Sequence, residues 1–132
     1  MKLHHIGIVV PNISDSLGEL TKFLKFDTVG MPTLIGSQKV NVCFMKLGSV
    51  NLELIEPAES DSPITSFTSN GGGFHHLCFE VKDINSTIDE LEKNGARLLV
   101  KPVIGFEDRL IAFLYLNMKH TNFNLIELAT QK

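Results

Sequence analysis

Two histidines and two glutamates occupy matching places in the two halves of this 132-residue sequence. His5 and His76 each complete a histidine doublet at the start of an apolar run, and Glu53 and Glu127 are each a lone acid inside a later apolar run. A buried carboxylate is costly unless it is paired or bound to a metal. Two imidazole nitrogens and two carboxylate oxygens suit Zn, Ni, Co, Mn or Fe, and one dication balances both acids. The four residues therefore predict a site for one divalent metal ion.

The rest of each half repeats as well. Asn12 corresponds to Asp83, and Leu17 to Ile88, at the same spacing as the histidines. Hydrophobic periodicity predicts a strand, a helix and three further strands in each half, a βαβββ module. The first module is expected to contain strands 3–10, 28–34, 40–47 and 50–55 and a helix over 12–24. The second is expected to contain strands 74–81, 97–100, 110–116 and 123–129 and a helix over 83–94.

The repeat predicts one domain, residues 1–132, rather than two independent ones. Module one covers 1–57, a linker with a short helical turn covers 58–72, and module two covers 73–132. A module of about 65 residues is marginal alone, so pairing to share a core is expected. The fold class is therefore α+β, with two βαβββ modules paired by pseudo-twofold symmetry.

Strand periodicity predicts where the repeated residues point. Side chains of a strand alternate between its two faces, and apolar Ile6 and Ile8 suit the face that a helix covers. His5 then lies on the opposite face, and His76 shares its face with Cys78 and Glu80 by the same parity. If the modules pair about a pseudo-twofold axis, both imidazoles and both carboxylates converge in one apolar cleft.

Composition excludes several kinds of partner. The net charge of −3 at pH 7 gives no basic surface for nucleic acid or for an acidic membrane. No apolar run approaches the roughly 18 residues of a membrane span. Cys43 and Cys78 form no CxxC motif, and the sequence shows no leader segment. They are expected to be reduced, buried thiols in a cytoplasmic protein.

The motifs together resemble the vicinal oxygen chelate superfamily, and within it the methylmalonyl-CoA epimerases and glyoxalase-I-like proteins. The segments that carry the resemblance, which spans almost the whole chain, are 5–10, 52–57, 61–64, 73–81, 83–84, 112–114 and 125–128. The resemblance implies an open, cupped, barrel-like sheet with the helices outside and a metal inside. Carried over by position, it implies His5, Glu53, His76 and Glu127 as the ligands of one divalent ion (Zn, Ni, Co or Mn), and it implies a homodimer.

The resemblance also implies chemistry at the carbon alpha to a carbonyl or thioester. A metal would stabilise the enolate oxygen while a neighbouring carboxylate removes and returns the proton. Glu127 is the first choice for that base and Glu53 the second. The substrate would be a small molecule, possibly an acyl-CoA or a thiol adduct. Residues expected to contact it are Val42, Phe44, Cys78 and Arg109, the last as a holder of an anionic tail unless its loop, 105–109, is simply solvated.

The sequence departs from both relatives. Val42 stands where the epimerases carry a second catalytic glutamate, and valine cannot move a proton. The Asp-Pro-Asp-Gly turn of the glyoxalases is replaced by residues 117–122. A non-catalytic small-molecule binding protein of the resistance type is therefore the alternative. An extradiol-type dioxygenase ranks third, because such enzymes use two histidines and one glutamate and leave Glu53 without a role.

Overall fold

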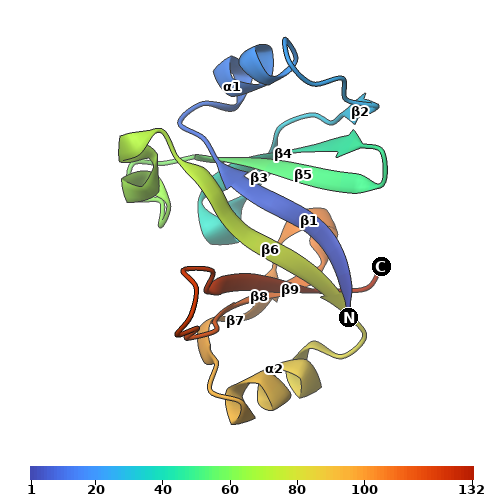
Figure 1. Ribbon diagram of the computed structural model, residues 1–132, viewed down its shortest axis with the longest axis vertical. Coiled ribbons are helices and arrows are strands. Elements are labelled where there is room, and N and C mark those ends of the chain that lie inside the picture. Colours follow the sequence, from blue (N-terminus) through green and yellow to red (C-terminus); the bar gives the residue numbers. More distant parts are fainter. The chain divides into compact units, whose positions relative to one another are not determined.

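The computed structural model describes all residues, Met1–Lys132, and the α+β class is confirmed. The chain forms two compact units. The N-terminal unit is His5–His75, and the C-terminal unit is His76–Lys132 together with Met1–His4. The boundaries fall inside strands β1 (Lys2–Val9) and β6 (Gly73–Val81), so the predicted linker 58–72 belongs to the N-terminal unit. Each unit contains one α-helix beside its strands (Figure 1).

In the N-terminal unit the strands follow the order β2-β4-β5-β1, with β3 also paired to β4. The strands other than β1 are β2 (Thr28–Val29), β3 (Thr33–Ile35), β4 (Val40–Leu47) and β5 (Val50–Pro57). β4 and β5 form the predicted hairpin, and β5 runs parallel to β1. The strand expected over 28–34 is split into β2 and β3 by residues 30–32: Gly30 N still donates to Phe44 O of β4, but Pro32 has no amide hydrogen with which to continue the pairing.

In the C-terminal unit the order is β6-β9-β8-β7. The strands after β6 are β7 (Arg97–Ile104), β8 (Leu110–Tyr115) and β9 (Leu125–Thr130). β6 and β9 are parallel, as β1 and β5 are, and β8 is antiparallel to β9. The end predicted for β7 at Val100 is wrong, because the strand continues through Pro102 with two register shifts. An edge strand tolerates proline, since one of its sides needs no hydrogen bond.

The two helices begin as the repeat predicts. The Asn12 side chain accepts a hydrogen bond from Asp15 N at the start of α1 (Ile13–Leu20), and the Asp83 side chain accepts one from Ser86 N at the start of α2 (Ile84–Lys93). These side chains satisfy amides that the first helical turn leaves unpaired. Both helices pack against strands of their own units (Figure 1).

The predicted extension of α1 to Leu24 is wrong. The helix ends at Leu20, and Phe23 is 84% exposed instead of joining the buried face. Lys22 N and Phe23 N donate to carbonyls three residues back, Glu19 O and Leu20 O, so the last turn tightens. Tightening rotates the following side chains out of register with the apolar stripe.

Three short 3₁₀ segments complete the structure: η1 (Gly36–Gln38), η2 (Thr65–Asn70) and η3 (Phe106–Asp108). η2 corresponds to the helical turn expected in residues 58–72. No helix combines the length and the apolar character that crossing a bilayer would require.

The core of the N-terminal unit lies on both faces of its strands. Ile8 packs with Ile13 and the other apolar residues of α1, whereas its neighbour Val9 packs on the other side with Val42 and Ile55. The prediction that Ile8 faces the helix is confirmed. In the C-terminal unit, Ile84 and Ile88 of α2 pack on residues of β8 and β9.

Substituting Gly72 should destabilise the protein far more than substituting its neighbour Gly71. Both have positive φ, which costs an alanine about 1–2 kcal/mol. A Cβ on Gly71 meets open space, but a Cβ on Gly72 would lie 2.1 Å from the Val9 carbonyl oxygen, so backbone must move. We expect Gly72→Ala to lower the free energy of unfolding by at least about 3 kcal/mol. Urea unfolding of the two variants measures this, and equal losses would contradict the predicted close approach.

Candidate metal centre

The N-terminal unit brings His5 and Glu53 into contact. β1 and β5 run parallel with Gly7 opposite Glu53, so His5 and Glu53 share a sheet face. His5 Nε2 lies 3.2 Å from Glu53 Oε1. The two residues are 1% and 4% exposed. A histidine and a glutamate that are far apart in sequence thus form a buried pair.

The C-terminal unit repeats this arrangement. β6 and β9 place Cys78 opposite Glu127, as Gly7 stands opposite Glu53. His76 Nε2 lies 3.1 Å from Glu127 Oε1, and both residues are buried. The repeat seen in the sequence is therefore a repeat of one buried histidine–glutamate pair in each unit.

A phenylalanine supports each pair. Phe44 is the cross-strand partner of Glu53, and its ring meets the His5 ring edge-on at 5.2 Å between centroids. Phe113 is the partner of Glu127, and its ring meets His76 edge-on at 5.3 Å. Edge-to-face contacts of this kind fix the orientation of an imidazole.

Phe113 was not among the site residues predicted from sequence. Its equivalence to Phe44 is hidden because β4 and β5 join through Gly48 and Ser49 alone, whereas the connection from β8 to β9 covers 116–124. A linear alignment of the halves therefore loses register at this hairpin. Pairing each glutamate with the residue at the same distance before the turn of its hairpin, instead of aligning the halves linearly, would have found it.

The geometry of each pair fits metal ligation. Two ligands at about 2.0–2.2 Å from a zinc-like ion, at tetrahedral to octahedral angles, lie about 2.8–3.6 Å apart. The measured separations of 3.2 and 3.1 Å fall in that range. They also fit a hydrogen bond from a protonated Nε2, which holds the same two side chains together without metal. Each pair can therefore offer one nitrogen and one oxygen ligand after losing a proton.

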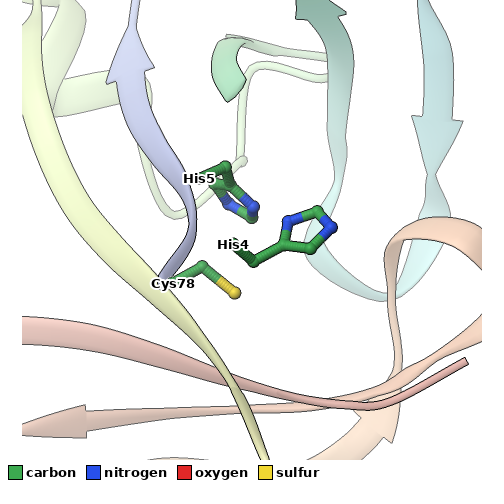
Figure 2. A group of neighbouring side chains, drawn as sticks. All are labelled: His4, His5 and Cys78. Carbon is green, nitrogen blue, oxygen red and sulfur yellow. The ribbon is translucent and has the colours of Figure 1, made fainter. Parts of the chain in front are cut away.

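The remaining predicted contact residues lie beside these pairs or at the end of their strands. Val42 is buried and belongs to the apolar cluster of Val9 and Ile55. Cys78, labelled in Figure 2, is a fully buried thiol on β6. The His4 ring packs against the Phe106 ring, with 5.0 Å between the centroids.

Arg109 is not a solvated loop residue, because it is only 8% exposed. Its Nη1 donates to Glu80 Oε2 at 2.6 Å, and its Nε donates to Glu107 Oε1 at 3.0 Å. Burial opposes the charge of the guanidinium, but the bonds to both carboxylates prevail and raise its pKa above the usual value. Arg109 therefore stays charged inside an ion-pair network.

Removing the Glu80 charge should lower the free energy of unfolding at neutral pH but change it little at acid pH. The hydrogen bond from Arg109 lowers the pKa of the Glu80 carboxyl from its usual 4.5. The ion pair therefore contributes fully above about pH 4.5 and is lost as pH falls through the lowered pKa. We expect Glu80→Gln to cost about 1–2 kcal/mol at pH 7. Urea unfolding of both proteins from neutral to acid pH measures the difference, and a gap independent of pH would contradict this assignment.

The chain matches a known protein family over most of its length. Residues 4–113 match the glyoxalase/bleomycin resistance protein/dioxygenase superfamily. An ethylmalonyl-CoA/methylmalonyl-CoA epimerase of Cereibacter sphaeroides is 34% identical over 131 residues, covering 96% of this chain and 96% of that protein. The mitochondrial methylmalonyl-CoA epimerase of Bos taurus is 32% identical over 117 residues, and the match covers 86% of this chain and 66% of that longer protein.

Solved structures agree with the sequence comparison. A variant of Streptomyces coelicolor methylmalonyl-CoA epimerase in complex with 2-nitronate-propionyl-CoA matches with a TM-score of 0.84 at 26% identity, over 99% of this chain and 94% of that chain. The methylmalonyl-CoA epimerase of Mycobacterium tuberculosis also gives 0.84, at 21% identity over 99% and 88%. The second likeness shows the fold alone.

Proposed function

Because the chain belongs to the glyoxalase/bleomycin resistance protein/dioxygenase superfamily, we propose that it is an epimerase-like isomerase that moves a proton at the carbon alpha to a thioester carbonyl. The observation that carries this proposal is the epimerase relative matched along nearly the full length of both chains. A methylmalonyl-CoA-like thioester is the proposed substrate. The Cereibacter sphaeroides relative is named for ethylmalonyl-CoA as well, so a substituent larger than methyl is included in the substrate class.

The proposed cofactor is one divalent ion shared by the two buried pairs. His5, Glu53, His76 and Glu127 are a set of donors that could hold a metal ion. Burial supports this role, because a dication neutralises two carboxylates that are each only 4% exposed. When bound, such an ion supplies Lewis-acid stabilisation of the enolate oxygen that forms when the alpha proton leaves.

Glu127 is proposed as the base. Its carboxylate is oriented by the contact with His76 and enclosed by Cys78 and Phe113, its neighbours on the adjoining strands. A carboxylate held in this way beside an imidazole can take up a proton and return it. Glu53, which has the same arrangement in the N-terminal unit, is proposed as the second proton carrier.

Val42 supports a second candidate function, that of a small-molecule binding protein without turnover. It is buried between Val9 and Ile55 on the face that carries Glu53, so no acid occupies that position. A binding protein would retain its ligand after Glu127→Gln, because no proton is moved. An isomerase would lose turnover while keeping its substrate.

Solvent exchange tests the proposal. The metal-loaded protein is incubated in deuterium oxide with methylmalonyl-CoA, ethylmalonyl-CoA or a hemithioacetal, and incorporation at the alpha carbon is followed by mass spectrometry. We expect exchange with the acyl-CoA thioesters well above the protein-free rate. No exchange with any of the three, at full metal occupancy, would contradict an isomerase and favour the binding protein.

The predictions of a homodimer and of a cytoplasmic protein remain predictions. Cys43 and Cys78 are both buried and form no disulfide, which agrees with reduced thiols. Burial raises the pKa of the Cys43 thiol, so this residue is kept in its unreactive protonated form.

A further inference from the structure

Arg109 makes contacts that reach beyond its own loop. Besides its two carboxylate partners, its Nη1 donates to the carbonyl oxygen of Thr130 at 3.0 Å. The next residue, Leu110, uses its amide to bond the Thr130 hydroxyl at 3.2 Å. One side chain thus ties together Glu80 on β6 and Thr130 at the end of β9.

These are the two strands that carry His76 and Glu127. Glu80 follows His76 by four residues, so both side chains lie on the same face of β6. The strand register places Glu80 opposite Ala129 and Cys78 opposite Glu127. A slip of one residue between these strands would turn Glu127 to the other face. The bonds from Arg109 to Glu80 and Thr130 form a clamp that joins the ends of β6 and β9. This clamp opposes such a slip and so helps to keep His76 in contact with Glu127.

The loop before β8 is built to hold the guanidinium in place. Phe106 is buried, and the Arg109 guanidinium lies 5.4 Å from its ring centroid. Gly105 N donates to Arg109 O, and a Cβ on Gly105 would lie 2.5 Å from a side-chain carbon of Ile111. Glu107 and Asp108 both adopt positive φ, of 53° and 57°. Positive φ is unfavourable for residues other than glycine, so two such residues in succession strain the backbone of this loop. The bonds around Arg109 must offset that strain.

We propose that Arg109 is a positioning residue, whose clamp from β6 to β9 holds His76 and Glu127 in the register that ligates the metal. This inference rests on the proposed metal site and replaces the expectation that Arg109 holds an anionic substrate tail. Its charge is already matched by Glu80 and Glu107, so an incoming anion would have to displace a carboxylate.

Cobalt binding tests the proposal without requiring turnover. Wild type, Arg109→Met, Arg109→Lys and Arg97→Met are titrated with Co²⁺, and affinity and visible absorption spectrum are recorded beside the melting temperature. Arg97 is the matched control, because it is the other arginine of the chain and its guanidinium lies over the Tyr115 ring, 5.4 Å from the centroid. We expect Arg109→Met to weaken Co²⁺ binding about 10-fold or more and to alter the spectrum. Arg109→Lys should recover part of the affinity.

A merely structural role predicts a different result. Arg109→Met would then melt at a lower temperature but bind Co²⁺ with unchanged affinity and spectrum, which would overturn the proposal. If Arg109→Met does not fold, Glu80→Gln removes the other half of the clamp and should weaken Co²⁺ binding in the same direction. Unchanged affinity in Glu80→Gln would also overturn it. Failure of the wild type to bind Co²⁺ would instead overturn the metal site of the proposed function.

Discussion

Replacing Glu127 with glutamine should reduce deuterium exchange at the alpha carbon of methylmalonyl-CoA by about 10²–10⁴-fold. The amide keeps the size of the side chain but cannot accept the proton. Its oxygen can still contact His76, so folding should be preserved. Exchange measured by mass spectrometry at saturating substrate gives the size of the loss.

Two further glutamine variants make this result specific. Glu92→Gln changes an exposed acid on α2 and should exchange at the wild-type rate. Glu53→Gln should also lose exchange if both carboxylates carry protons. Wild-type exchange in Glu127→Gln would remove this residue from the chemistry and leave Glu53 as the base.

Removing the metal should abolish exchange and destabilise the fold. A ligand at 100 times its dissociation constant contributes about 2.7 kcal/mol to stability. For a chain of this size that corresponds to a fall of about 10 °C in melting temperature after dialysis against a chelator. Readdition of the ion should restore both properties. Unchanged exchange in protein shown by elemental analysis to be metal-free would refute a metal-dependent reaction.

The histidine doublets provide matched controls for this experiment. His76→Ala removes a proposed ligand and should lose the metal-dependent stabilisation. His75→Ala removes a neighbour that packs edge-on against Phe67 at 5.3 Å, and should keep that stabilisation. If both variants respond to metal as the wild type does, His76 is not a ligand.

Most of the fold could be predicted from sequence because its signals are local. β4 begins and ends as expected, since Gly48 and Ser49 mark the turn after it. The helix starts were also predictable from Asn12 and Asp83, whose side chains cap them. The end of α1 was not, because Phe23 fits the apolar period and only the tightened last turn moves it to the surface.

The candidate site was less predictable, because its partners are set by strand register. Repetition pointed to His5 and Glu53, but their contact depends on the parallel pairing of β1 with β5. Phe113 was missed because the two hairpins differ in length. The role of Arg109 could not be predicted either, because the local sequence indicates a solvated, charged loop. Its partner Glu80 lies 29 residues away in sequence and is brought beside it only by the fold.

The central claim is that the two buried pairs share one ion. Anomalous scattering from crystals of the cobalt-loaded protein tests it most directly. We predict one peak per chain, within about 2.0–2.2 Å of a donor atom of each of four residues. Those residues are His5, Glu53, His76 and Glu127. A peak bonded to one pair alone, or separate peaks at the two pairs, would contradict the claim.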